Sequence, residues 1–177
     1  LTINTAIFRT DWDNLPTSIP PTSNTCPDRI TNNIGSAESQ GIEMDINYHL
    51  SDDWQLSLGA SYIDTKRVEV RTPLKEGEPL PYAPRTNAIL GLQYTFTANG
   101  FNSYVRTDIA YVGKYESAPA WLADLGIKPA GDYANINLRF GMSIEQWDLA
   151  IYAKNLSNND ELLVHANGVG ETSLGVR

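Results

Sequence analysis

The sequence predicts an all-β fold, and within that class a segment of an antiparallel up-and-down transmembrane β-barrel. Seven runs alternate apolar and polar residues with a period of two, the pattern of strands with one apolar and one wet face. The runs have about ten to fourteen residues, enough for a tilted strand to cross a bilayer, whereas strands of soluble proteins usually have about five or six. Short and long connections alternate between the runs, as short periplasmic turns and long extracellular loops do in outer-membrane barrels.

The predicted strands lie near 1–12, 37–50, 54–66, 85–96, 101–115, 132–144 and 147–157. In the run at 37–50, the apolar face consists of Ile42, Met44, Ile46, Tyr48 and Leu50. The polar face consists of Glu43, Asp45, Asn47 and His49. Trp54, Leu56 and Leu58 continue the pattern after the turn "SDD". The runs at 37–50 and 54–66 therefore predict a hairpin.

The later runs keep an apolar face opposite a polar one. In the run at 132–144, the apolar face consists of Ala134, Ile136, Leu138, Phe140, Met142 and Ile144. In the run at 101–115, Arg106 and Asp108 share the wet face, and Arg139 lies on the wet face of the following run. Such polar groups indicate a wet interior or a polar plug, because a barrel that carries an apolar ligand lines its inside with hydrophobic residues.

Aromatic residues gather at both ends of the predicted strands. Beside the short turns lie Tyr48, Trp54, Tyr94, Phe96, Phe101 and Trp147, and toward the long loops lie Trp12, Tyr62, Tyr111, Tyr115 and Tyr133. Tyr and Trp favour the membrane interface, since an apolar ring and a polar tip each meet a preferred medium. The rim of a sandwich core would also collect aromatic residues. These two aromatic girdles therefore support a membrane barrel only together with the alternating connection lengths.

Composition and residue spacing argue against several classes of function. The 177 residues carry 13 basic and 21 acidic side chains and a net charge of −8, which argues against nucleic acid as a partner. The single cysteine, Cys26, cannot form a disulfide within the chain, and we expect a loop thiol or a partner in sequence outside it. His49 and His165 lack metal-ligand spacing and no nucleophile elbow is present, so we expect no enzyme activity, cofactor or metal site.

Three stretches carry a resemblance to a known family. These are "AESQGIEMDINYHLSDDWQLSLGASYIDTK", "LPYAPRTNAILGLQYTF" and "WDLAIYAKNLSNND", in this order and spacing. The sequence resembles the C-terminal part of the β-barrel of TonB-dependent outer-membrane receptors. The resemblance implies about 7 strands of a 22-stranded barrel. Residues 1–177 would then be part of one barrel domain that lacks the N-terminal plug, most of the barrel and the closing C-terminal strand.

The resemblance also implies a function, namely active uptake of a scarce nutrient, foremost a ferric siderophore, across the outer membrane of a Gram-negative bacterium. The implied partners are outer-membrane lipid, the protein's own plug, the TonB complex and the small-molecule ligand. We expect Arg106, Asp108 and Arg139 to face the lumen or plug, and Tyr115 and Trp121 to contact ligand from the loops. Each has a simpler interpretation, because a lumen Arg can pair with a neighbouring carboxylate and Trp121 can pack within its own loop.

Two alternatives remain open on sequence alone. A secreted β-sandwich of adhesin or lectin type explains the hairpins and the acidity, but leaves the alternation of connection lengths as coincidence. A small complete outer-membrane barrel explains the alternation but needs an even number of strands. One further strand in 158–177, for which "ELLVHA" is the candidate, would supply it.

Overall fold

A computed structural model describes the chain except for residues 20–29, 34, 70–74, 119–128, 165–173 and 176–177. Seven long strands form one sheet in the order β1-β4-β5-β6-β7-β8-β9, and each strand pairs antiparallel with the next. Their bounds are β1 Thr2–Asp13, β4 Ser36–His49, β5 Trp54–Glu69, β6 Thr86–Ala98, β7 Phe101–Val112, β8 Tyr133–Ile144 and β9 Trp147–Ala153. The prediction of seven long strands in an up-and-down arrangement is confirmed.

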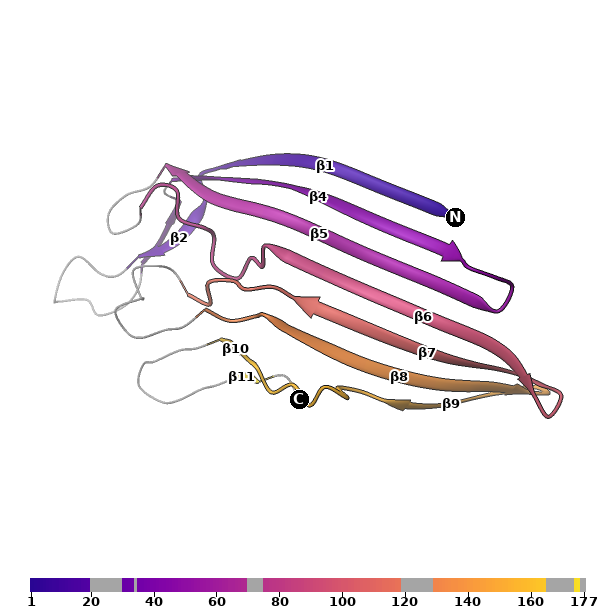
Figure 1. Cartoon of the computed structure of the whole chain (residues 1–177). Coiled ribbons are helices and arrows are strands. Elements are labelled where there is room, and N and C mark those ends of the chain that lie inside the picture. The colour runs from indigo at the N-terminus through magenta and orange to yellow at the C-terminus, as the bar shows by residue number, and fades with distance from the viewer. Residues whose placement is uncertain (20–29, 34, 70–74, 119–128, 165–173, 176–177) are drawn as a thin grey trace.

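The connections divide by length between the two ends of the sheet. The turns at 50–53, 99–100 and 145–146 lie at one end of the sheet, and the strand ends that the longer connections join, those of β1 and β4, β5 and β6, and β7 and β8, lie at the other (Figure 1). Asn99 and Gly100 both have positive φ, 52° and 84°, as a tight hairpin turn between twisted strands requires. Across the described ranges, no helix is long and apolar enough to cross a membrane.

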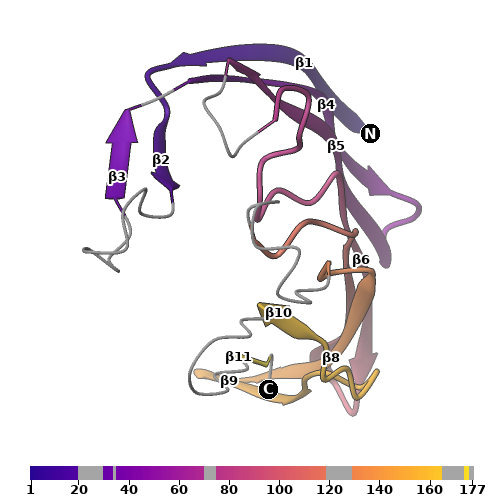
Figure 2. The ribbon, with the colours of Figure 1, turned by 90° about the vertical axis from the view of Figure 1, so that its left-hand side faces the viewer.

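The sheet bends into an open arc (Figure 2). Polar side chains lie on the concave face, where side chains of adjacent strands come close together. A Cβ atom on Gly91 would meet the side chains of Ser57 and Arg106. On the same face a hollow of about 390 Å³ extends from β4 to β7, lined among others by Glu43 and Ile89.

The convex face is apolar and uncovered. Ile7 is 82% exposed and Ile151 75%, and no second sheet packs against these residues in the part of the chain that the structure describes. A sandwich would bury this face against a facing sheet about 10 Å away. The exposed apolar face therefore fits a barrel wall and disfavours the sandwich alternative.

The aromatic girdles agree only in part with the prediction. Near the short turns, outward rings stack on one another: Trp54 of β5 lies 4.7 Å from Tyr94 of β6, and Tyr94 lies 5.5 Å from Phe96 of the same strand, measured between ring centroids. At the other end, Tyr62 and Tyr111 share the outward face. Strand register places Trp12 and Tyr133 on the concave face instead. Each lies an odd number of residues along its strand from an outward residue, Ile7 on β1 and Ala134 on β8. Alternation along a strand, not nearness to its end, decides the face.

Two small sheets lie outside the main one. β2 (Pro16–Ile19) pairs with β3 (Ile30–Asn33), and β10 (Leu162–Val164) pairs with β11 (Leu174–Gly175). Within the candidate strand "ELLVHA", Leu162–Val164 form β10, which pairs with β11 rather than with β9 and does not extend the main sheet. It does not supply the eighth strand that a small complete barrel would need.

Two strands end earlier than predicted. β7 ends at Val112, and Tyr115 beyond it forms only an isolated bridge with Ala130. β9 ends at Ala153 because Asn155 turns the chain, with φ of 53° and its side-chain Oδ1 accepting a hydrogen bond from the Asn159 N–H at 2.9 Å. Asn tolerates this left-handed backbone, so the predicted continuation to 157 was wrong.

Candidate functional site

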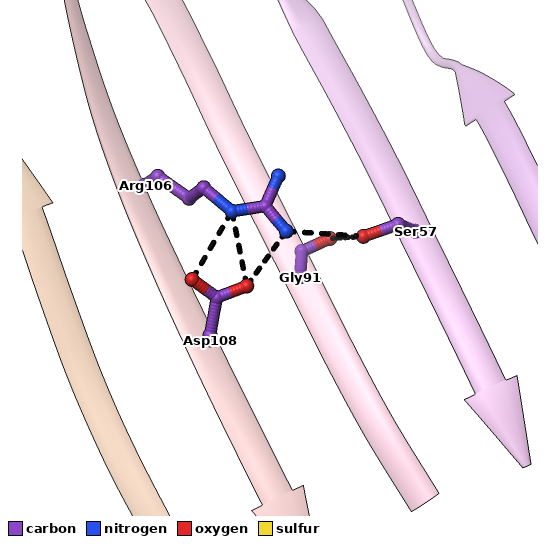
Figure 3. Close-up of polar contacts among 4 residues, drawn as sticks. All are labelled: Ser57, Gly91, Arg106 and Asp108. Carbon is purple, nitrogen blue, oxygen red and sulfur yellow. Dashed lines mark hydrogen bonds and ion pairs between the residues drawn. The ribbon is translucent and has the colours of Figure 1, made fainter. Parts of the chain in front are cut away.

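An ion pair on β7 lies on the concave face of the sheet, which we call the wall, beside β6 and β5 (Figure 3). Arg106 and Asp108 lie two residues apart and therefore point to the same face. The Arg106 Nε donates to both carboxylate oxygens of Asp108, at 3.0 and 3.1 Å, and its Nη2 donates to Oδ1 at 2.7 Å. This fork-like arrangement is among the stronger geometries of charged hydrogen bonds.

The same guanidinium spans the neighbouring strand. Its Nη2 lies 3.5 Å from the Ser57 Oγ on β5, across β6, and that hydroxyl donates in turn to the Gly91 carbonyl at 3.4 Å (Figure 3). A side chain at Gly91 would collide with the guanidinium, so glycine leaves the room that the contact needs. The cluster therefore ties three strands together on the concave side.

Arg139 lies directly opposite Arg106 in the pairing of β7 with β8. Its guanidinium carbon is 5.8 Å from the centroid of the Tyr104 ring, and that ring occupies the space above Gly141. Beside it is a hollow of about 410 Å³, whose lining includes Asp108, Asn137, Tyr152 and Lys154. The structure thus brings the three predicted lumen residues together on one part of the concave face.

Several residues of this wall were missed from the sequence. Tyr104, Tyr152 and Lys154 join the cluster, and the Lys154 Nζ lies 5.3 Å from the centroid of the Tyr152 ring. Parity along β7 would have assigned Tyr104 to the wall with Arg106. Placing Tyr152 beside Arg139 requires the register between β8 and β9, which the sequence does not provide by itself.

At the long-loop end, Tyr115 lines a third hollow, of about 280 Å³, together with Arg85, Lys114 and Glu116 among others. Its backbone exchanges two hydrogen bonds of 2.9 Å with Ala130. Burial raises the pKa of the Tyr115 hydroxyl, and Tyr133 and Glu161 nearby add to the rise. The other predicted loop contact, Trp121, lies outside the described residues.

A charged pair flanks this end of the sheet. The Lys114 Nζ is 3.1 Å from the Asp132 Oδ2, and hydrogen bonds from Lys114 and Tyr111 lower the pKa of the Asp132 carboxyl. Asp132 therefore remains ionised at neutral pH. Among the described residues, no group of three or more His, Cys, Asp and Glu side chains is arranged to hold a metal ion.

The Arg106–Asp108 pair gives a stability prediction. Changing Asp108 to Asn in the full-length protein should lower the free energy of unfolding by about 1 to 2 kcal/mol, because two arginines would then face each other without a carboxylate. The pair is about one-third exposed, which keeps the effect below that of a fully buried pair. Urea unfolding in phospholipid vesicles measures it.

Asp148→Asn is the matched control, since Asp148 is exposed on the same face and accepts a hydrogen bond of 2.7 Å from the neutral Ser143 hydroxyl. Asp148→Asn should lower the free energy of unfolding by less than Asp108→Asn does. A double-mutant cycle of Asp108→Asn with Arg106→Met should show coupling of about 1 kcal/mol. Strictly additive effects would contradict a stabilising pair.

Comparisons with known proteins point to one family. Residues 1–156 match the family model described as "TonB dependent receptor-like, beta-barrel". The Ferrioxamine B receptor of Salmonella typhimurium (strain SL1344) is 35% identical over 89 residues, which cover 50% of this chain and 12% of the receptor. A probable TonB-dependent siderophore receptor, PiuA of Acinetobacter baumannii, is 26% identical over 104 residues, covering 53% of this chain and 13% of PiuA.

Solved structures share the fold. The ferric yersiniabactin uptake receptor FyuA from Yersinia pestis superposes with a TM-score of 0.75 and 17% identity over 94% of this chain and 24% of FyuA. PiuA from Acinetobacter baumannii superposes with a TM-score of 0.67 and 21% identity over 92% of this chain and 22% of PiuA. The chain thus spans about a quarter or less of these structures and about an eighth of the curated relatives. The match of the family model to residues 1–156, on a sheet with the expected topology, shows that this chain belongs to the TonB-dependent receptors and forms part of their β-barrel.

Proposed function

We propose that the chain is a wall segment of an outer-membrane receptor that takes up a ferric siderophore at the expense of energy delivered by TonB. The observation that carries the proposal is the division of one continuous sheet into an exposed apolar face and a concave polar face. Support for the ligand class comes from relatives, among which are a ferrioxamine B receptor and a probable siderophore receptor.

In this proposal the convex face contacts outer-membrane lipid. Side chains such as Ile3, Ile7 and Leu149 are more than half exposed there, and burying such a surface in hydrocarbon is favourable by about 25 cal/mol per Å². The strands β1 and β4 to β8, with 12 to 16 residues each, are long enough to span the hydrocarbon layer when tilted, whereas β9 has 7 residues. Backbone groups at the sheet's two edges, β1 and β9, would pair with the remaining strands of a closed barrel.

The concave face holds a plug formed by the same polypeptide outside residues 1–177. Arg106, Asp108 and Arg139 are the plug-facing groups of this segment. At the long-loop end, Tyr115, which lines a hollow of about 280 Å³, contacts the ligand together with Trp121. TonB acts on the plug and not on the residues of this wall.

Uptake of radioactive iron tests the function. Iron-starved cells that lack the full-length gene, and the same cells with it restored, receive ferrioxamine B and a panel of other ferric hydroxamates and catecholates. We expect uptake of at least one complex to require the gene and to stop when a protonophore collapses the proton gradient. Unchanged uptake of every complex after deletion would contradict the siderophore assignment.

A further inference from the structure

A belt of charged side chains crosses the convex face at the end of the sheet where the longer connections join the strands. On β1, β4 and β5 its members are Arg9, Asp11, Glu38, Asp64 and Lys66. We infer that Arg9 and Lys66, held together by Glu38, dock the phosphate group of an anionic lipid headgroup. The inference rests on the proposed function, because it specifies what the convex face meets where the hydrocarbon layer ends.

The belt faces outward, since its members have the parity of outward apolar residues on their own strands. Arg9 lies two residues from Ile7, which is 82% exposed on the convex face. Lys66 lies four residues from the outward Tyr62 on β5, and strand register places Glu38 directly opposite Lys66. Arg9, Glu38 and Lys66 therefore share the convex face.

The belt begins where the apolar band of the convex face ends. On β5 the outward side chains from Trp54 to Tyr62 are apolar or aromatic, and the next two outward side chains are Asp64 and Lys66. Residues 54–62 agree in length with the roughly nine to eleven residues that a tilted strand needs to cross the hydrocarbon layer. Charged side chains are costly within hydrocarbon, so the belt lies at the level of the headgroups.

The charges occur at only one end of the convex face. From the middle of each described strand of the main sheet to the short turns, no outward position carries an acidic or basic side chain. The outward side chains beside the short turns include Tyr48, Trp54, Tyr94, Phe96 and Trp147. The convex face is thus built to meet an ionic headgroup layer at the belt and an aromatic-compatible interface at the short turns.

Glu38 holds the two cations of the docking site in place. Its Oε2 lies 2.9 Å from the Arg9 Nη2, and its Oε1 lies 3.2 Å from the Lys66 Nζ. The Glu38 side chain is only 8% exposed, whereas that of Arg9 is 61% exposed and that of Lys66 44%. The carboxylate is therefore recessed, and an approaching headgroup meets the two cations first.

The same order of exposure recurs in the neighbouring ion pairs. The Arg85 side chain is 59% exposed and that of its partner Asp64 37%. The Lys114 side chain is 74% exposed and that of its partner Asp132 48%. Cations thus form the outermost groups of these pairs, although the chain as a whole carries a net charge of −8.

A phosphate group fits the hydrogen-bond donors that the site offers. Asp11, an exposed carboxylate of the belt, accepts from the Arg9 Nε and Nη2, whereas the Arg9 Nη1 donates to no acceptor within the described ranges. A guanidinium can bind phosphate through two parallel N–H contacts, and an ammonium binds it as a point charge. The apolar Ile7 next to Arg9 on the same face offers a contact for an acyl chain, which favours a lipid over free phosphate.

Native mass spectrometry of the full-length receptor in detergent tests the inference. The probes are dioleoyl phosphatidic acid, whose headgroup is a phosphate monoester, and dioleoyl phosphatidylcholine, which has the same acyl chains but carries its own cation. The test variant combines Arg9→Gln and Lys66→Gln with Glu38→Gln, so that no recessed carboxylate is left without its partners.

Lys154→Gln is the matched control. Removing two cations and one carboxylate makes the net charge one unit more negative, and removing Lys154 alone does the same. Lys154 lines the hollow of about 410 Å³ on the concave face, so its loss leaves the convex belt intact. Heat-dependent migration on gels checks that each variant has folded.

We expect the wild-type receptor to retain more phosphatidic acid than phosphatidylcholine at equal lipid concentrations. The triple variant should bind about fivefold less phosphatidic acid, the scale of two exposed charge contacts, and Lys154→Gln should stay within about twofold of wild type. The comparison of the two lipids needs only the wild-type receptor, so it decides the question even where the triple variant does not fold.

Three results would overturn the inference: equal retention of the two lipids by the wild type, unchanged binding of phosphatidic acid by the folded triple variant, or an equal loss in Lys154→Gln. Lipid binding is measured without any iron complex, which separates this failure from that of the proposed function. Iron uptake without selective lipid binding refutes only the headgroup site, and selective lipid binding without uptake of any complex refutes only the siderophore assignment.

Discussion

Replacing Leu90 by arginine is expected to lower the free energy of unfolding of the full-length receptor in vesicles by about 2 to 4 kcal/mol. Leu90 lies within β6 on the convex face, between Leu58 and Ile109 of the adjacent strands. An arginine there would have to enter hydrocarbon or distort the bilayer to reach water. Urea unfolding monitored by tryptophan fluorescence provides the measurement.

Ile89→Arg is the matched control, since it places the same charge one residue away on the concave face. Ile89 is 52% exposed and lines the hollow that also contains Glu43 and Asp45. An arginine there would meet water and two carboxylates, so the expected loss is below about 1 kcal/mol. Equal losses in the free energy of unfolding for the two variants would contradict the prediction that the convex face of β6, and not the concave face, contacts lipid.

Replacing Gly41 by alanine is expected to cost about 1 to 3 kcal/mol. An added Cβ would collide with the Tyr62 carbonyl oxygen and approach the Phe8 ring to 3.0 Å. The carbonyl belongs to the backbone of β5, so it cannot move away without disturbing the pairing of β4 with β5.

Gly59→Ala separates this clash from the general cost of changing a strand glycine. Its Cβ would lie 3.2 Å from the Ile89 Cγ2 and 3.3 Å from the Asp45 Oδ1, which belong to exposed side chains and not to backbone, so a shift of a few tenths of an ångström relieves both contacts. We expect Gly59→Ala to have little effect on the unfolding midpoint in urea. If Gly41→Ala were tolerated equally well, the close approach of β4 and β5 at Gly41 would be wrong.

The strands could be predicted from sequence because the bilayer and the lumen impose the same alternation on each of them. The run from Ala134 to Ile144 shows this directly, since one face is continuously apolar and coincides with the convex side of β8. Strand ends were less certain, because they depend on single backbone conformations such as that of Asn155.

The wall cluster was only partly accessible from sequence. Parity alone placed Arg106, Asp108 and Arg139 on one side, but it did not indicate which residues of different strands become neighbours. That information comes from register, which brings Tyr152 opposite Arg139 and Arg106 over Gly91. The aromatic residues Trp12 and Tyr133 show the reverse error, since position near a strand end predicted a face that their parity contradicts.

The measurement that tests the account most directly is an accessibility scan along β6. Single cysteines at each position from 88 to 95 carry a nitroxide label in the full-length receptor in vesicles, with the native cysteines replaced by serine. We predict a period of two, with even positions accessible to oxygen dissolved in lipid and odd positions to a water-soluble nickel chelate. Accessibility without this alternation, or chelate access at Leu90 and Leu92, would contradict a barrel wall that separates lipid from lumen.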